Sequence, residues 1–178
     1  MAILKFKHLI FFLLILPGCA TTYKNQAVLT KQFPKVNGQN LEKTPIEMPK
    51  YFMGKHTILL IGYKQNSQFD IDRWILGLTD SGVTVKVYEL PTVVGMIPRM
   101  ISGKIDSGMR SGIPKELWVD VITLYGDEAK KIAKFTGNER PINARVMLLD
   151  PSGKITFFHD QGYGVSYLKQ LCELLPKK

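Results

Sequence analysis

The apolar positions of this chain follow two alternating patterns, one typical of strands and one typical of helices. A continuous apolar run at residues 58–61, bounded by Gly62 and polar residues, predicts a strand buried on both faces. Residues 69–78 follow with an apolar stripe at helical spacing that includes Trp74. In open α/β folds, chemistry is usually placed where such a strand meets its helix, so the loop 64–68 is the first place to look for a site.

The pattern continues along the chain and predicts further elements. The Asn37-Gly38 pair predicts a turn between short apolar segments, as in an entry hairpin. Residues 83–88 alternate at period two, which predicts a strand with one buried face. Residues 92–110 carry apolar side chains every four positions and predict a long helix. Residues 117–125 are rich in β-branched and aromatic residues and predict another strand.

The C-terminal part predicts a short helix, a hairpin and a final helix. Residues 127–135 begin with acids and end with lysines, which matches the helix dipole. Residues 144–149 and 155–158 flank Asp150-Pro151-Ser152-Gly153, where Pro and Gly suit a tight turn. The last helix, residues 165–175, has one apolar stripe made of Val165, Leu168, Cys172 and Leu175.

The chain opens with a basic start and a short apolar run. Residues 1–8 contain two lysines, and residues 9–16 are apolar but shorter than the roughly 20 residues that span a bilayer. The run ends in Leu16-Pro17-Gly18-Cys19, which resembles the lipobox of bacterial lipoproteins. The resemblance implies that residues 1–18 are a signal peptide and that Cys19, acylated on its thiol, becomes the new N-terminus. The alternative is an ordinary signal peptide with an incidental Cys19.

The residues after the cysteine bear on where the protein lies. Ala20, rather than Asp, follows Cys19, which by resemblance to sorting in diderm bacteria favours the outer membrane over the inner one. Residues 19–32 are polar without periodicity and predict a tether to a domain at residues 33–178. We therefore expect a lipid-anchored protein of the cell envelope that faces the periplasm.

The charge balance narrows the classes of partner. The chain has 178 residues with Lys+Arg 24 against Asp+Glu 15, a net charge of +9, and a 45% hydrophobic content that suits one globular domain. The lysines are scattered, which favours a solvated, membrane-adjacent surface and argues against nucleic-acid binding. We expect the membrane, reached through the lipid anchor, and another envelope protein as partners.

The cysteines and histidines give no sign of a cofactor. Cys19 and Cys172 are the two cysteines, and they match neither a metal-ligand spacing nor a C-x-x-C pair. Cys172 lies on an apolar helical stripe and is expected to be a small core residue. His56 and His159 belong to different elements. We therefore expect no metal site and no cofactor.

Three short motifs, in the order of elements predicted above, resemble the thioredoxin-like superfamily in its peroxiredoxin and cytochrome-maturation branch. They are Gly54-Lys55 before the buried strand, Leu148-Leu149-Asp150-Pro151-Ser152-Gly153-Lys154-Ile155 in the hairpin, and Gly162-Tyr163-Gly164 before the last helix. The resemblance implies an α/β domain, a thioredoxin-like mixed β-sheet flanked by helices, after the N-terminal lipoprotein signal peptide.

Redox enzymes of that superfamily carry a cysteine where the first central strand meets its helix, because the helix N-terminus lowers the pKa of the thiol. The loop 64–68 occupies that place and contains no cysteine. Ser67 with Asp70 there resembles a capping box with Asp in place of Glu. The family's cis-proline would fall near Ala144. These departures predict a domain without catalytic residues whose function lies on its surface.

A narrower resemblance points to a role. Residues 99–114, a basic helix with a Ser-Gly-Ile-Pro exit, resemble the thioredoxin-like assembly factor of mitochondrial ATP synthase and its bacterial relatives, which chaperone a membrane partner. Arg99 and Arg110 are candidates to bind an acidic partner or phospholipid headgroups. The alternative is an exposed face on which Asp106 and Arg110 form an ion pair worth about 0.3–0.5 kcal/mol.

Two functions follow from these patterns. The first is a lipid-anchored envelope protein with a redox-inactive thioredoxin-like domain, which binds or assists assembly of a partner protein. The alternative is a periplasmic thiol or peroxide oxidoreductase of the same superfamily.

Overall fold

A mixed sheet of seven strands forms the middle of the computed structural model, which describes residues 21–95 and 99–176. The strands lie in the order β2-β1-β5-β4-β3-β6-β7. They are β1 (Val36–Asn40), β2 (Pro45–Met48), β3 (Thr57–Gly62), β4 (Lys86–Val93), β5 (Ile122–Tyr125), β6 (Arg145–Leu149) and β7 (Ile155–His159). β3 and β5 each pair with β4 in parallel, and all other pairs are antiparallel.

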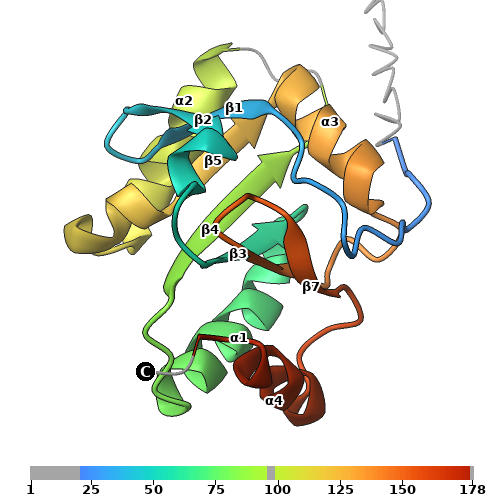
Figure 1. The fold of residues 1–178 in the computed structure, drawn as a ribbon. Helices are drawn as coiled ribbons and strands as arrows, with labels where there is room; N and C mark the ends of the chain where they lie inside the picture. The colour runs from blue at the N-terminus through green and yellow to red at the C-terminus, as the bar shows by residue number, and fades with distance from the viewer. Residues whose placement is uncertain (1–20, 96–98, 177–178) are drawn as a thin grey trace, which may run out of the picture.

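Helices cover both faces of this sheet (Figure 1). α1 (Gln68–Asp80) and α4 (Val165–Glu173) pack on one face, and α3 (Gly126–Thr136) packs on the other. α2 (Arg99–Gly112) lies between β4 and β5 in the sequence, and short 3-10 turns are η1 (Lys50–Phe52), η2 (Gln65–Ser67) and η3 (Lys115–Asp120). The predicted mixed sheet flanked by helices is confirmed.

The predicted central strand has a core on each of its faces. All six residues of β3 are buried. Leu59 and Ile61 belong to the cluster under α3, and Ile58 and Leu60 belong to the cluster under α1 and α4. Alternate side chains of a strand point to opposite faces, so a continuous apolar run suits a strand covered on both sides. Trp74 of the predicted α1 stripe is fully buried against the second cluster.

The entry hairpin turns at a different place from the one predicted. Asn37 and Gly38 lie inside β1, and the turn is at residues 41–44, closed by a hydrogen bond from Asn40 N to Thr44 O. Gly38 is needed for packing, because a Cβ there would lie 2.7 Å from Ile122 Cγ2 and 3.0 Å from the Thr123 carbonyl. A glycine that allows close approach of a neighbouring strand resembles a turn glycine in the sequence.

Two predicted boundaries in the middle of the chain are also wrong. β4 continues to Val93, so the helix predicted over residues 92–110 does not include residues 92–93, and its described part is α2, Arg99–Gly112. The strand predicted over residues 117–125 is divided: η3 takes its first part, and β5 keeps only Ile122–Tyr125. β-branched and aromatic residues favour a half-buried surface as much as a strand, and the residues of η3 lie beside β4 as 3-10 turns without forming a ladder with it.

The C-terminal elements follow the prediction closely. β6 and β7 pair around residues 150–153, where Asp150 N donates to Lys154 O and Gly153 has φ +81°. In α4, Leu168 and Leu171 are buried. Val165 was predicted on the apolar stripe but is 58% exposed, because it is the first residue of the helix and extends beyond the sheet-covering part.

The predicted tether differs from the structure. Residues 21–32, hereafter the docked segment, run along α3 (Figure 1, blue) and hydrogen-bond to the domain instead of hanging free. Val28 in this segment is fully buried in the cluster under α3. The domain boundary predicted at residue 33 therefore falls inside a packed region, while the predicted signal peptide (residues 1–18) and Cys19 lie outside the described residues.

Candidate functional site

The turn from β3 into α1 contains polar side chains that are used within the fold. Lys64, Gln65 and Asn66 are exposed, whereas Ser67 is buried. The Ser67 hydroxyl donates to the Lys64 carbonyl, with 2.6 Å between Oγ and O. It also packs against Gly62, whose missing side chain leaves room for it. The place where the resemblance expects a reactive thiol therefore holds a hydroxyl that is already hydrogen-bonded.

The predicted capping box of Ser67 and Asp70 is wrong. Within the described residues, α1 has no side-chain hydrogen bond at its N-cap, because Ser67 bonds backwards to Lys64. Asp70 Oδ2 instead accepts from Ala144 N–H at 2.8 Å, and Asp70 Oδ1 accepts from Tyr163 N–H at 2.7 Å. The carboxylate is buried. It joins α1 to the residue before β6 and to the segment that leads into α4.

The residue before β6 is alanine, where the resemblance implies a cis-proline. Ala144 is fully buried, and its N–H is used by Asp70. Within the described residues, the cis peptide bond is Met48–Pro49, at the end of β2. The place predicted for a cis-proline thus holds a buried alanine.

The first residue of β6, Arg145, is a feature that the sequence patterns did not single out. It is 0% exposed, and its guanidinium lies 5.2 Å over the ring of Tyr63. It donates to the carbonyls of Gly137, Arg140 and Asn143 and to Asn25 Oδ1. Burial lowers the pKa of Arg145. In the sequence, Arg145 is visible only as one charged residue at the start of an otherwise apolar run. No sequence pattern brings together the segments that hold its hydrogen-bond partners.

The described cysteine, Cys172, belongs to α4 and not to the turn after β3. Cys172 lies on α4, half-buried, and packs against the cluster under α1 and α4, as predicted. A thiolate nucleophile normally sits in a partly exposed, electropositive position. The described residues of the turn after β3 supply no thiol of their own.

The two predicted partner-binding arginines lie on α2. Arg99 is its first residue, and its side chain lies outside the described part of the chain. Arg110 is half-buried: its Nε donates to the Leu41 carbonyl at 2.6 Å, and its guanidinium lies 5.9 Å from the Trp118 ring. Asp106 accepts from the Tyr125 hydroxyl at 2.7 Å. The predicted ion pair of Asp106 with Arg110 is therefore wrong, since each side chain finds a tertiary partner.

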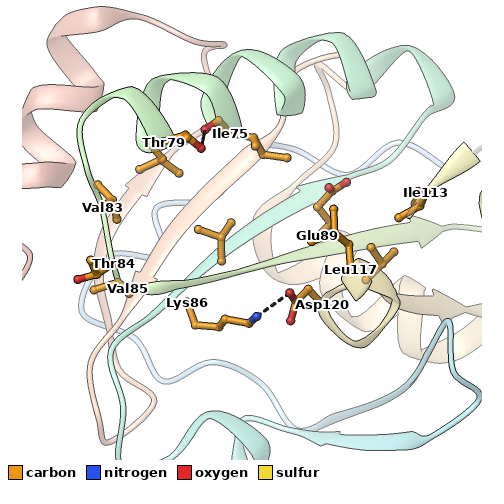
Figure 2. A pocket seen from close by; sticks show the side chains of 13 residues that line it. Ile75, Thr79, Val83, Thr84, Val85, Lys86, Glu89, Ile113, Leu117 and Asp120 are labelled. Atoms are coloured by element: carbon orange, nitrogen blue, oxygen red, sulfur yellow. Dashed lines mark hydrogen bonds and ion pairs between the residues drawn. The ribbon is translucent and has the colours of Figure 1, made fainter. Parts of the chain in front are cut away.

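A cavity of about 290 Å³ opens between α1, the first half of β4 and η3 (Figure 2). Its walls are mostly apolar and include Ile75, Val87 and Leu117. β5 pairs with β4 only near its end, at Thr92 and Val93, so the first half of β4 has η3 beside it instead of a strand. The cavity is a consequence of this incomplete pairing.

Acidic groups lie in the wall of the cavity. Lys86 Nζ contacts Asp120 Oδ2 at 2.6 Å, and Asp120 Oδ1 is buried with no hydrogen-bond partner among the described residues. Glu89 accepts from Gln68 Nε2 at 3.2 Å. Burial raises the pKa of the Glu89 carboxyl, and the Gln68 donor partly opposes this. The cavity can take an apolar group that brings a hydrogen-bond donor to these oxygens.

The described histidines belong to the core and its edges. His159 is buried, its Nε2 donates to the Gly162 carbonyl at 2.7 Å, and its ring centroid lies 3.9 Å from that of Tyr167. Within residues 21–95 and 99–176, no group of His, Cys, Asp and Glu is arranged to hold a metal ion. Nor does any described helix have the length and apolar content needed to pass through a bilayer.

No protein-family model and no curated protein sequence matches this chain. Solved structures do match it. The thiol peroxidase from Chromobacterium violaceum has a TM-score of 0.57 at 10% identity, with 86% of this chain and 90% of that chain covered. BsSco, a member of the Sco family of cytochrome c oxidase assembly proteins, has a TM-score of 0.55 at 10% identity, with coverage of 84% and 95%.

A third match is the exposed lipoprotein thioredoxin Etrx1 from Streptococcus pneumoniae. It has a TM-score of 0.52 at 12% identity, and the alignment covers 80% of this chain and 100% of that one. Identities this low carry the fold and not the activity. The described part of the chain has a thioredoxin-like fold, with a mixed sheet flanked by helices.

Proposed function

We propose that this chain is a lipid-anchored protein of the cell envelope whose thioredoxin-like domain binds a partner protein, or assists its assembly, without thiol chemistry. The observation that carries the proposal is the turn after β3. It has no cysteine, and its buried polar groups, Ser67 and Asp70, are occupied by hydrogen bonds within the fold. Such a turn maintains the fold and leaves function to the surface.

The matched structures give both parts of the proposal a precedent on this fold. BsSco belongs to a family of assembly proteins, and Etrx1 is a lipoprotein. In this chain the lipid would be carried by Cys19, and the expected side is the periplasmic side of the envelope, at the outer membrane in preference to the inner one.

The cavity beside β4 is the surface that best suits a partner. Leu117, on its rim, is 50% exposed, and η3, which carries it, follows directly after α2 with Arg99 and Arg110. An exposed apolar rim next to basic residues matches the anchor and charge pattern of protein interfaces. Arg110, whose guanidinium lies 5.9 Å from the centroid of the Trp118 ring in η3, is the arginine that can contribute at this rim, and the contribution of Arg99 stays a prediction from the sequence.

Capture of the lipidated protein from envelopes tests this assignment. Leu117→Arg places a charge on the cavity rim and is expected to lose one stoichiometric partner that the unchanged protein recovers. The matched control is Met53→Arg, because Met53 is also 50% exposed but follows η1, which packs against Tyr88 on the other face of β4. Arg99→Glu with Arg110→Glu is expected to lose the same partner. Equal recovery with all variants, or recovery of lipid alone, contradicts the proposal.

A thiol assay separates the proposal from the alternative oxidoreductase. The reduced protein is expected to turn over neither a disulfide nor a peroxide substrate. Turnover that Cys172→Ser abolishes would replace the binding function with an enzyme that uses the thiol on α4.

A further inference from the structure

The residues just after the predicted lipid attachment point are bound to the domain. Tyr23 N–H donates to Asn138 Oδ1 at 2.7 Å, and the Tyr23 carbonyl accepts from Asn138 N–H at 2.9 Å. Gln26 N–H donates to the Thr136 carbonyl at 3.0 Å. Asn138 Nδ2 also donates to the Thr21 carbonyl at 3.3 Å, so the docked segment makes contacts from its first residue and is paired with the end of α3 and the loop that follows.

Asn25 fixes this segment from several sides. Its Nδ2 donates to Asp160 Oδ2 at 2.8 Å, and its Oδ1 accepts from Arg145 Nη2 at 3.1 Å and from Glu139 N at 3.2 Å. Its backbone crosses Gly137, where no side chain would fit and where φ is +75°. Partly buried and charge-assisted hydrogen bonds of this kind restrict the segment to one path.

The spacer between lipid and docked residue is short. Only Ala20, Thr21 and Thr22 separate Cys19 from Tyr23. An extended chain spans at most about 3.6 Å per residue, so Tyr23 lies within roughly 14 Å of the lipid-bearing cysteine. A domain fastened so close to its anchor has little freedom to turn, and the surface around Tyr23 must lie next to the bilayer.

That surface is basic. Lys134 Nζ lies 5.9 Å from the Tyr23 ring centroid, and Lys130 is one helical turn earlier on α3. Lys24 and Arg140 are exposed on the two segments that cross there. The acids at this place, Glu139 and Asp160, both accept hydrogen bonds from Asn25. The four basic side chains, Lys24, Lys130, Lys134 and Arg140, form what we call the basic face.

We infer that the basic face rests on an anionic phospholipid surface and that the docked segment holds the domain in one orientation on the membrane. The inference rests on the proposed lipid anchor at Cys19. This orientation also determines which way the cavity faces, because α1 and α4 cover the face of the sheet opposite to α3 (Figure 1). Glu89 and Val87 line the cavity on the α1 side. The cavity therefore points away from the lipid, towards a partner.

Rates of lysine acylation in the lipidated full chain test this orientation. The protein is placed in vesicles of phosphatidylethanolamine with phosphatidylglycerol, or in vesicles of phosphatidylcholine alone, and each lysine is followed by peptide mass spectrometry. Lys169, exposed on α4, is the internal reference. In the anionic vesicles Lys24, Lys130 and Lys134 are expected to react at least about fivefold more slowly than Lys169, a protection of the size that one basic contact with an anionic surface gives.

A linker variant shows whether the short spacer produces the effect. A flexible Gly/Ser insert between Thr21 and Thr22 adds reach of about 5–6 Å times the square root of its length and is expected to restore the reaction of the three lysines. The matched control carries the same insert after Lys178 and is expected to keep the protection.

Three results count against the orientation. The first is an equal rate at all four lysines (Lys24, Lys130, Lys134 and Lys169) on anionic vesicles while Cys19 is acylated. This result overturns the orientation and leaves the proposed anchor standing. Protection that survives the insert between Thr21 and Thr22 overturns the role of the short spacer in fixing the orientation. An N-terminal peptide without acyl groups overturns the proposed anchor and the orientation with it.

Discussion

Burial disfavours the charged form of both Glu89 and Arg145, but the two side chains differ in the partners that surround them. Arg145 is fully buried, yet its guanidinium meets three carbonyls, an amide oxygen and an aromatic ring, so its charge is solvated by the protein. Glu89 has one donor, Gln68, and lines an apolar cavity. Burial therefore raises the pKa of the Glu89 carboxyl above its value in the unfolded chain.

Glu89 makes the stability of the domain depend on pH. Its pKa in the folded state is raised above the ordinary value of 4.5, so the folded protein binds more protons than the unfolded chain between these two values. Stability contributed by this group is present at low pH and is lost as pH rises through the raised pKa. Glu89→Gln removes this titration. As pH rises from about 4 to about 7, the unfolding free energy of the variant is therefore expected to increase relative to that of the unchanged protein.

Urea denaturation at both pH values measures this difference. Glu42→Gln is the control, because Glu42 is exposed. If Glu89→Gln and the unchanged protein show parallel pH profiles, the carboxyl at position 89 is not desolvated as described.

At the scale of elements, Asp70 links three parts of the fold. It lies in the first turn of α1 and accepts backbone N–H groups from the residue before β6 and from the lead into α4. The sequence placed the same residue in a capping box, because Asp near a helix start has that local role most often. The tertiary role wins since Ala144 and Tyr163 bring buried N–H groups that have to be paired.

Asp70→Asn is expected to lower the unfolding free energy by about 1–3 kcal/mol, because an amide has one acceptor oxygen for two buried N–H groups. Asp72→Asn is the matched control: Asp72 lies two residues later on the exposed side of α1 and accepts a hydrogen bond from the exposed Gln68 side chain. Its change is expected to stay within about 0.5 kcal/mol. Urea denaturation of both variants measures these changes. Equal decreases in unfolding free energy would mean that Asp70 does not join α1 to β6 and α4.

At the scale of the whole molecule, the docked segment completes the core on the α3 side. Val28 is 0% exposed and belongs to the same cluster as Leu59 of β3 and Ile132 of α3. Hydrogen bonds tie the segment to residues more than a hundred positions away, as from Tyr23 to Asn138 with a sequence separation of 115. Residues 21–32 are thus part of the folded domain.

Val28→Ala is expected to lower the unfolding free energy by about 2 kcal/mol, the cost of emptying part of a packed core. Leu29→Ala removes more carbon from the neighbouring residue, but Leu29 is 51% exposed and the change is expected to be near neutral. Thermal or urea unfolding of the two variants compares them directly. A free tether would make both changes neutral.

The sequence by itself determined the features that depend on neighbouring residues. The run at residues 58–61 predicted a strand covered on both faces, the stripe with Trp74 predicted α1, and residues 150–153 predicted the hairpin turn. It also showed that the loop 64–68 has no cysteine. Periodicity and turn chemistry act over a few residues, so they can be interpreted without knowing the fold.

Only the tertiary structure decided which distant groups meet. It placed Arg145 under the docked segment, moved Gly38 from a turn to a strand crossing, and gave Asp106 and Arg110 separate partners in place of each other. Buried polar groups take the partners that packing brings to them, and those partners come from segments far away in the chain. The polar residues after Cys19 looked like a tether for the same reason, because the groups that bind them lie at the other end of the sequence.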